Sequence, residues 1–377
     1  MKKVCFIIDS LRFGGAQKVT ADLASLLSVN GYQVDLVIYK NVRNISIHSS
    51  VNIRFVKIDG LSRNGFLGFL DASLSKVFGL PYQFIMSKFY SRSLANKVDF
   101  EKYNKVFLCS DSAVVPFHNI SNKFVFIAHS LKSKQHLDCL FPLNRLKKWI
   151  YRSIISQKSV IAVSDGIKDD LIISFGISRD KIKRIYNFID FEHVKHMSSQ
   201  KAEQFIDFEY ICHVGRHSKE KNIELLINAF SKLSNQEIKL VLVGQGPYTS
   251  KLKKQVSKLG LSKQVIFLGF QKNPYVYMKN AKCLVLSSNR EGLPTVLLEA
   301  LSLSTKVVST NCPSGPSEIL NNNLEEYLVP VNDELALTRA INKSLEDNRP
   351  IDDSILNEFG KSTILKSYLE FININTK

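Results

Sequence analysis

Residues 2–39 read KKVCFIIDSLRFGGAQKVTADLASLLSVNGYQVDLVIY, and their pattern of apolar residues and glycines indicates the fold class. An apolar run at 3–8 predicts a buried strand, which is followed by a loop with a glycine pair at 14–15. A helical pattern covers 16–29 and stops at an Asn-Gly pair, after which VDLVIY at 34–39 predicts a second buried strand. This order of strand, loop, helix and strand is typical of a doubly wound parallel sheet.

The same alternation occurs twice along the 377 residues. Later apolar runs predict further strands at 51–58, 105–109, 123–129 and 159–164, and a second series at 210–215, 239–244, 264–269, 282–288 and 306–310. We therefore predict an α/β protein of two Rossmann-like domains, each built on a doubly wound parallel sheet. The predicted boundaries are 1–190 for the first domain, 191–208 for a linker without strand pattern, 209–353 for the second domain and 354–377 for a C-terminal helix.

Composition excludes several classes of protein. Hydrophobic residues make up 45% of the chain, which is enough for buried cores. No stretch approaches the roughly 18 uninterrupted apolar residues of a spanning helix, and we expect the N-terminus to form a first strand rather than a signal peptide. The six cysteines are scattered, at 5, 109, 139, 212, 283 and 312, so we expect them to be core residues in a reducing compartment.

The positive charge is concentrated in the first half of the chain. Residues 1–200 contain 29 Lys and Arg against 15 Asp and Glu, and the rest contains 22 against 19, so 14 of the net +17 lies before residue 201. Such asymmetry indicates a polyanionic partner, either an acidic membrane surface or a nucleic acid.

Two clusters behind predicted strands are suited to bind an anion. Gly14 and Gly15 would let a backbone approach a ligand closely at a helix start, although a simple tight turn explains them equally well. In GRHSKEKN at 215–222, Arg216 and Lys221 offer donors for a diphosphate, and the alternative is a solvated basic loop.

Two further signals are acidic or titratable. EGLPTVLLE at 291–299 places two glutamates eight apart around a predicted helix start, where backbone amides form another anion seat. Because Glu299 lies in an apolar run, we expect it to be buried with a hydrogen-bond partner rather than exposed. His129 ends the predicted strand FVFIAH, and a lone histidine in such a place is often structural.

These clusters, in this order, make the whole chain resemble glycosyltransferase family 4, a retaining family with the GT-B fold. The resemblance rests on GGAQKV at 14–19, VGRHSKEKN at 214–222, LVLVGQGP at 240–247 and the family's E-x7-E motif at 291–299. It implies that the first domain binds the acceptor and the second domain the nucleotide sugar. It also implies that Gly14 and Gly15 abut the donor diphosphate across an interdomain cleft, and that the C-terminal helix packs back on the first domain.

The resemblance also implies roles for residues of the second domain and for His129. Arg216 and Lys221 would bind the diphosphate and stabilise the leaving charge, and His129 would lie beside the transferred sugar. Glu291 would contact the donor sugar and Glu299 the ribose hydroxyls. The phosphate seat would be completed by Gly292, Leu293, Pro294 and Thr295, and the nucleotide base bordered by Gly244, Gly246 and Phe270.

The reaction implied is transfer from a nucleotide sugar, with UDP favoured by family frequency. Positioned cations and amides would offset the charge that builds on the departing β-phosphate. No Asp-x-Asp pair ends a predicted strand, so we expect no metal and no cofactor. The turn N-F-I-D at 187–190 replaces the N-G-V-D common in relatives, and the residues after His129 also differ, which leaves the acceptor contacts open.

The stretches 60–92 and 131–158 interleave apolar residues with lysine and arginine. They could lie in an anionic membrane interface, or they could be ordinary core helices. The first interpretation predicts a peripheral protein at the cytoplasmic face of the cell membrane that acts on a lipid-linked saccharide.

Two rival functions remain at this stage. A sugar-nucleotide epimerase of the same fold would need acid and base residues, and the intact E-x7-E motif argues against it. A nucleic-acid-binding protein would explain the charge, but no known nucleic-acid module is visible, so we expect no nucleic-acid partner.

Overall fold

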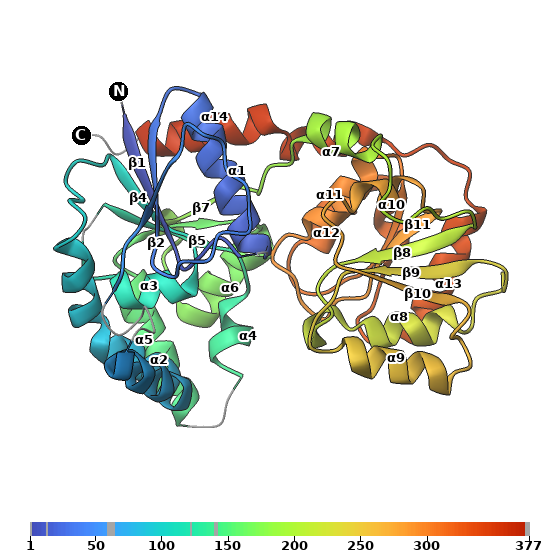
Figure 1. The fold of residues 1–377 in the computed structure, drawn as a ribbon, viewed down its shortest axis with the longest axis horizontal. Helices are drawn as coiled ribbons and strands as arrows, with labels where there is room; N and C mark the ends of the chain where they lie inside the picture. Colours follow the sequence, from blue (N-terminus) through green and yellow to red (C-terminus); the bar gives the residue numbers. More distant parts are fainter. Residues whose placement is uncertain (1, 13, 59–64, 121–122, 139–141, 374–377) are drawn as a thin grey trace. The chain divides into compact units, whose positions relative to one another are not determined.

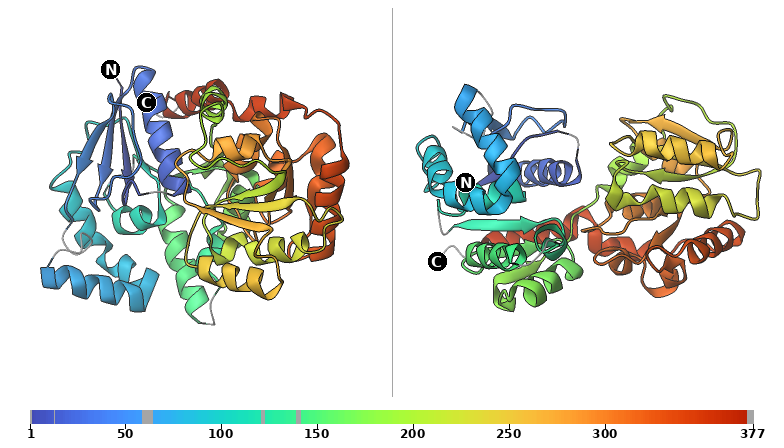
Figure 2. Two further views of the ribbon diagram at one scale, coloured as in Figure 1. Left: turned by 45° about the vertical axis from the view of Figure 1, so that its right-hand side comes forward. Right: turned by 90° about the horizontal axis from the view of Figure 1, so that it is seen from below.

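The computed structural model describes residues 2–12, 14–58, 65–120, 123–138 and 142–373. The chain divides into two compact units: residues 1–188 with 364–377, and residues 189–363. Each unit contains one parallel sheet with helices on both faces, so the predicted fold class is confirmed (Figures 1 and 2).

The first unit is built on a seven-stranded sheet of order β3-β2-β1-β4-β5-β6-β7. Its strands are β1 (Lys3–Ile8), β2 (Gln33–Ile38), β3 (Asn52–Phe55), β4 (Lys105–Leu108), β5 (Phe124–Ala128), β6 (Ser159–Ala162) and β7 (Ile182–Arg184). Its helices are α1 (Gly15–Val29), α2 (Gly65–Ala95), α3 (Asp111–Phe117), α4 (Lys132–His136), α5 (Leu143–Ile155), α6 (Asp165–Phe175) and the 3-10 turn η1 (Arg179–Lys181). Strand order reverses between β1 and β4, the place where ligands bind in sheets of this kind.

Strands β1 and β5 show why the sheet forms. Every residue from Val4 to Ile8 and from Phe124 to Ala128 is buried, as expected for strands that helices cover on both faces. Helix α2 is kinked, since Gly79 has φ 58° and Pro81 follows it inside the helix. Past the kink, α2 packs against α5.

The second unit is built on a six-stranded sheet of order β10-β9-β8-β11-β12-β13. Its strands are β8 (Tyr210–Val214), β9 (Lys239–Val243), β10 (Val265–Gly269), β11 (Cys283–Leu286), β12 (Lys306–Thr310) and β13 (Leu328–Val329). Its helices are α7 (Phe191–Ser198), α8 (Ile223–Phe230), α9 (Thr249–Lys258), α10 (Tyr275–Lys279), α11 (Thr295–Ser302), α12 (Pro316–Ile319) and α13 (Glu334–Glu346). The 3-10 turns are η2 (Lys219–Lys221), η3 (Asn322–Tyr327) and η4 (Asp353–Phe359).

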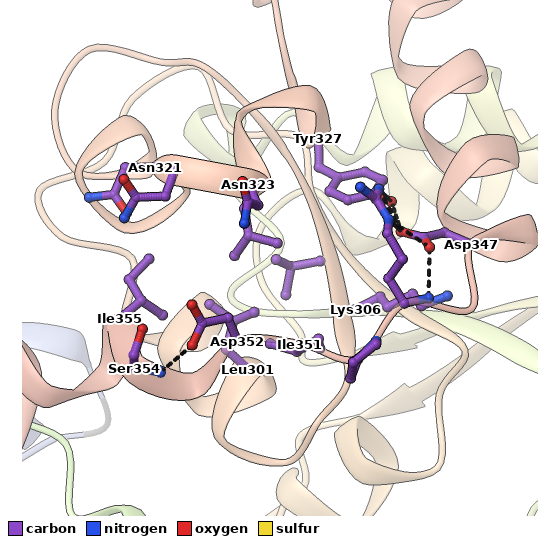
Figure 3. Close-up of a pocket in the computed structure, with 15 residues that line it drawn as sticks. Leu301, Lys306, Asn321, Asn323, Tyr327, Asp347, Ile351, Asp352, Ser354 and Ile355 are labelled. Carbon is purple, nitrogen blue, oxygen red and sulfur yellow. Dashed lines mark hydrogen bonds and ion pairs between the residues drawn. The ribbon is translucent and has the colours of Figure 1, made fainter.

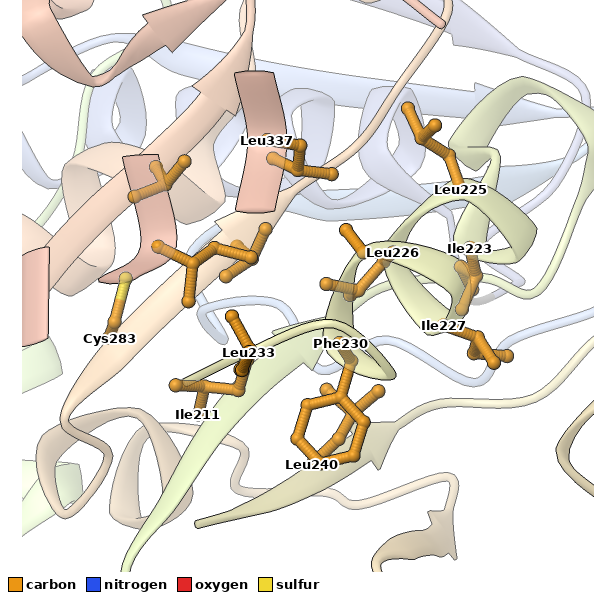
Figure 4. Close-up of a cluster of buried hydrophobic side chains, with 14 of the residues drawn as sticks. Ile211, Ile223, Leu225, Leu226, Ile227, Phe230, Leu233, Leu240, Cys283 and Leu337 are labelled. Carbon is orange, nitrogen blue, oxygen red and sulfur yellow. The ribbon is translucent and has the colours of Figure 1, made fainter. Parts of the chain in front are cut away.

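A continuous hydrophobic core holds the second unit together (Figure 4). Ile223, Leu226 and Phe230 of α8 pack with Leu240 of β9 and with Leu337 of α13. This core fixes the start of α8, and with it the loop that leads from β8 into that helix.

Helices occupy the segments that were predicted to lie at the domain boundaries. The predicted linker, 191–208, contains α7, which Asp190 caps by accepting a hydrogen bond from the His193 amide at 3.1 Å, and which packs on α10 and α11. The last helix, α14 (Lys361–Asn373), buries Tyr368 against the Phe107 ring of β4 at a centroid distance of 6.3 Å. No helix in the described ranges is long and apolar enough to cross a membrane.

Candidate functional site

The predicted donor residues of the second unit follow the carboxyl ends of neighbouring strands. Lys221 follows β8 and Glu291 follows β11, which lies next to β8 in the sheet, so both loops rise from the same edge. The Asn289 amide donates to the Glu220 carbonyl at 2.8 Å, and the Ser287 hydroxyl donates to the Lys221 carbonyl at 3.0 Å. The two loops are therefore bound to each other.

Lys221 and Glu291 form an ion pair at the centre of these loops. The Lys221 Nζ lies 2.6 Å from the Glu291 Oε1, which also accepts the Ser288 hydroxyl at 2.6 Å. The side chains are 23% and 11% exposed, so the pair is shielded from most solvent and still accessible to a ligand. Such a pair presents an ammonium group and a carboxylate to one bound molecule.

Gly244 and Gly246 allow a second loop to pack against the first. Gly244 has φ 133°, and a Cβ there would stand 1.9 Å from the Gly215 carbonyl oxygen; a Cβ on Gly246 would stand 2.4 Å from the His217 carbonyl oxygen. Larger residues would push the two loops apart. The glycines were predicted to border the nucleotide base, and in this unit they bring the β9 loop against Gly215 and His217.

His217 and His213 are buried structural groups that sequence analysis did not single out. The His217 Nδ1 meets the Thr249 hydroxyl at 2.9 Å, and the His213 Nδ1 donates to the Val285 carbonyl at 3.0 Å. Burial lowers the pKa of His217 to about 4 and that of His213 to about 3. Both rings are thus neutral at pH 7 and stiffen the base of the loops.

The start of α11 carries the rest of the E-x7-E motif. Pro294 occupies the N-cap position, and the Ser314 hydroxyl donates to the Gly292 carbonyl at 2.6 Å. Gly315 has φ 92° and lies so close that a Cβ would stand 2.5 Å from the Pro294 side chain. Leu293 is buried and Thr295 is half-buried, so a fixed backbone precedes the free amides of the helix start.

Glu299, Arg216 and Phe270 complete the predicted set in this unit. Glu299 is 7% exposed, which confirms the expectation that it is buried on α11. Arg216 is exposed and makes no ion pair with any residue in the described part of the chain, so its guanidinium is available to a ligand. Phe270, directly after β10, exposes 41% of its surface.

In the first unit, Gly14 and Gly15 lie where β1 leads into α1. Gly14 is the N-cap residue, and a Cβ there would meet only the movable end of the Gln17 side chain; a Cβ on Gly15 would meet no atom within 4 Å. Gly15 therefore faces open space at this helix start, which suits the predicted approach of a ligand. Phe13, which precedes them, lies outside the described residues.

His129 lies at the carboxyl end of β5, beside a charged cluster. Burial and the nearby Lys132 ammonium lower the pKa of His129 to about 4, against the opposing effect of Asp111. The imidazole is therefore neutral at pH 7. Its Nε2 is buried and hydrogen-bonds to none of the described residues, so it can accept or donate a bond to a ligand.

The charged cluster beside His129 was missed by sequence analysis. Lys132, only 2% exposed, places its Nζ 2.8 Å from the Asp111 Oδ2, and the Tyr151 hydroxyl donates to the Asp111 Oδ1 at 3.0 Å. Burial by itself would raise the pKa of Asp111, but Lys132 holds it below the usual value. A signal was present, because Asp111 comes just after the predicted strand 105–109 and His129 ends the predicted strand 123–129.

A cavity of about 150 Å³ lies elsewhere in the second unit (Figure 3). It is bounded by Leu301, Lys306 and Tyr327, and by the segment from Asp347 to Ile355. Arg349 is bound to Asp347 and Glu326 beside it. None of the predicted site residues lines this cavity.

Comparison with solved structures identifies the fold as that of two-domain glycosyltransferases. The structure of Anabaena HepE in complex with UDP and glucose superposes with a TM-score of 0.73 at 18% identity, covering 99% of this chain and 100% of that one. The lipopolysaccharide outer core galactosyltransferase WaaB superposes with a TM-score of 0.67 at 19% identity, covering 98% and 99%.

Sequence comparison then gives the family. Residues 196–363 match the family described as "Glycosyl transferases group 1", and residues 13–193 match "Glycosyltransferase Family 4". A Campylobacter jejuni protein named N-acetylgalactosamine-N,N'-diacetylbacillosaminyl-diphospho-undecaprenol 4-alpha-N-acetylgalactosaminyltransferase is 30% identical over 364 residues, which cover 93% of this chain and 92% of that protein. The amylovoran biosynthesis glycosyltransferase AmsD of Erwinia amylovora is 21% identical over 91% of this chain and 90% of its own. The chain belongs to glycosyltransferase family 4.

Proposed function

We propose that this protein transfers a sugar, with retention of configuration, from a UDP-sugar to a lipid-linked saccharide of surface-glycan assembly. The observation that carries the proposal is the Lys221–Glu291 ion pair beside the fixed start of α11. A nucleotide sugar presents a diphosphate and a ring of hydroxyls together, and this arrangement offers an ammonium and amides to the first and a carboxylate to the second.

In the proposed reaction the second unit holds the donor. Lys221, the exposed Arg216 and the backbone amides of Gly292, Leu293 and Thr295 stabilise the charge that grows on the β-phosphate as the glycosidic bond breaks. Glu291 positions the donor sugar and Glu299 the ribose. The neutral His129 accepts or donates a hydrogen bond at the transferred sugar, and no protein nucleophile is required.

The acceptor class is supported by the relatives. The Campylobacter jejuni protein is named for an acceptor on diphospho-undecaprenol, and its identity with this chain extends over nearly the whole length of both. The acceptor class does not determine which sugar is transferred. We take N-acetylgalactosamine, which the name of the Campylobacter jejuni protein gives, as the first donor sugar to test.

Helix α5 supports a peripheral position on an anionic membrane. Leu146 and Trp149 are 45% and 60% exposed on one side of α5, and the basic residues Arg145, Lys148 and Arg152 are exposed beside them. The opposite side of α5 belongs to the core, since Ile150 and Ile154 are buried there. One face of the helix therefore fits the membrane interpretation of the sequence, and the other face fits the interpretation as a core helix. Apolar side chains next to cations suit a bilayer interface at the cytoplasmic face. Residues 60–64 and 139–141 of the predicted membrane stretches lie outside the described ranges.

A thermal-shift screen tests the donor site. The protein is melted with UDP, GDP, ADP and CMP, and with UDP-N-acetylgalactosamine; UDP and its sugar should raise the melting temperature, and Lys221→Ala and Glu299→Ala should abolish the rise. Stabilisation by none of the nucleotides would contradict the donor site.

Product analysis separates the transferase from its rival. A transferase releases UDP rapidly only when an acceptor is present, whereas an epimerase of this fold would convert the nucleotide sugar alone.

Co-sedimentation with phosphatidylglycerol vesicles, compared with binding to an oligonucleotide, tests the membrane surface. Trp149→Ser should weaken binding to the vesicles and leave binding to the oligonucleotide unchanged.

A further inference from the structure

The first unit contains a cavity of about 260 Å³ at the carboxyl edge of its sheet, bounded by α2, α3, α4 and α5. Its polar lining comes from Gln83, Asp111, Ser112, Gln135, His136 and Lys147. None of these residues belongs to the predicted donor set. The cavity therefore has a polar wall for which donor binding gives no reason.

The lining is mostly uncharged at neutral pH. Asp111 is compensated by the Lys132 ammonium at 2.8 Å, and burial lowers the pKa of His136 to about 4, so its imidazole is neutral. Two amides and a hydroxyl complete the wall. Only Lys147 adds a cation, and it forms no ion pair with any residue of the described ranges.

This chemistry suits a sugar better than an anion. Amides, a hydroxyl and a neutral imidazole both donate and accept hydrogen bonds, and the compensated carboxylate accepts them, as sugar hydroxyl and acetamido groups require. A phosphate would meet the Asp111 carboxylate and a single unpaired ammonium. The volume is slightly below the roughly 300–1,000 Å³ of pockets for drug-sized ligands, so it has room for about one sugar ring.

The cavity is adjacent to both features that an acceptor on a lipid would need. On one side, Asp111 in the cavity wall and its partner Lys132 lie near His129, whose pKa their charges affect. His129 is the residue predicted to lie beside the transferred sugar. On the other side of the cavity, Phe84 follows Gln83 on α2 and meets the exposed Trp149 of α5 edge to face at 6.0 Å. The wall thus leads from the proposed membrane face of α5 to the edge of the sheet.

We infer that this cavity binds one uncharged pyranose of the acceptor saccharide. The inference rests on the proposed function and specifies where the acceptor is recognised. Gln83 and Gln135 bind the ring substituents, Asp111 accepts from a hydroxyl, and the Lys132–Asp111–Tyr151 bonds hold that carboxylate in place.

Trp149 is the only tryptophan in the chain, so it reports on this region in the unmodified protein. The unmodified protein is titrated into the millimolar range with the methyl glycosides of N-acetylgalactosamine, N-acetylglucosamine, galactose and glucose, and Trp149 fluorescence is recorded. At least one glycoside should give a saturable change, which Gln83→Ala/Gln135→Ala should weaken at least tenfold. Asn323→Ala, in the cavity of the second unit, is the matched control and should leave the titration unchanged.

The outcomes distinguish this inference from the proposed function. A UDP thermal shift that persists in the double variant shows that this variant folds and binds donor. If no glycoside changes the fluorescence while the UDP shift is intact, the inference is wrong and the donor site stands. If inorganic pyrophosphate gives the saturable change and Lys147→Ala removes it, the cavity is an anion site and the inference is equally wrong. A glycoside response without any nucleotide shift would instead contradict the proposed function.

Discussion

Lys221 and Glu291 should have opposite effects on UDP affinity, although they are partners in one ion pair. A β-phosphate oxygen bound to the Lys221 Nζ would lie within about 6 Å of the Glu291 carboxylate, given the 2.6 Å between the pair. At an effective dielectric constant near 20, the repulsion between two unit charges at that distance is about 3 kcal/mol. Because the side chains are 23% and 11% exposed, we reduce this figure for solvent and salt to roughly 1 kcal/mol.

Glu291→Gln should therefore bind UDP about fivefold more tightly while transferring sugar more slowly. Lys221→Ala removes a charge-assisted hydrogen bond, which contributes about 1.5–3 kcal/mol, so UDP should bind about 10- to 150-fold more weakly. In the double variant, removal of the carboxylate should restore part of that loss.

Isothermal titration calorimetry of UDP binding measures all three variants. Lys251→Ala is the matched control, because Lys251 forms a 2.7 Å pair with Glu224 in the same unit, with Lys251 63% exposed and outside the predicted site. This control should change the UDP affinity very little. If Glu291→Gln weakens UDP binding as much as Lys221→Ala does, the pair supports the loops instead of presenting its charges to a diphosphate.

Three further predictions concern stability. Gly244→Ala should lower the melting temperature by about 6 °C or more, because its Cβ would stand 1.9 Å from the Gly215 carbonyl oxygen. Gly260→Ala is the control: Gly260 has φ 71° but open space around it, so this substitution should lower the free energy of unfolding by only about 1–2 kcal/mol. Equal effects of the two substitutions would refute the close packing of the loops. Burial lowers the pKa of His213 to about 3 in the folded state, against about 6.5 in the unfolded chain, so the unfolded state takes up more protons as the pH falls below 6.5. Stability should therefore fall by up to about 1.4 kcal/mol per pH unit. Urea unfolding at pH 7 and pH 5 should show a smaller difference in His213→Asn, and an unchanged difference would disprove the assignment. Tyr368→Ala should lower the stability of the first unit by about 3–5 kcal/mol by uncovering Phe107, and truncation before Ile355 should destabilise the unit further. Glu370→Ala, at an exposed position of the same helix, is the control. If Tyr368→Ala and Glu370→Ala give equal melting curves, a structural role for α14 is excluded.

The strands that sequence predicted well are those buried on both faces. Residues Val4 to Ile8 are completely buried in β1, and such strands are continuous apolar runs. The predicted strand 51–58 pairs only at Asn52–Phe55, since β3 is a half-exposed edge strand. Strand β7, at the other edge of this sheet, has three residues, and β13, at an edge of the second sheet, has two, which are too few for a pattern to show.

The loops around Lys221 and Glu291 could be predicted from the sequence, whereas the charged cluster beside His129 could not. Lys221 and Glu291 follow strands that are neighbours in the sheet, so a parallel topology alone predicts that their loops meet. The Asp111–Lys132 pair instead depends on how α4, five residues long, packs on α6, whose Asp170 accepts from the Lys132 amide at 2.6 Å, and no periodic pattern encodes that geometry. The packing role of Gly244 and Gly246 was likewise hidden, because a glycine in a loop shows neither its φ nor its neighbours.

The positive charge of the first half of the chain can now be divided between surface and interior. Lys132 is neutralised by Asp111 inside the first unit, and the 260 Å³ cavity has a nearly uncharged wall. Exposed cations stand elsewhere, among them Arg145, Lys148 and Arg152 of α5. Because salt screens exposed charges and scarcely affects hydrogen bonds to neutral groups, the two proposed contacts should separate in a salt titration. Binding to anionic vesicles should decline between low and high salt, while the glycoside response of Trp149 should persist, so a shared salt dependence would mean that one basic surface accounts for both.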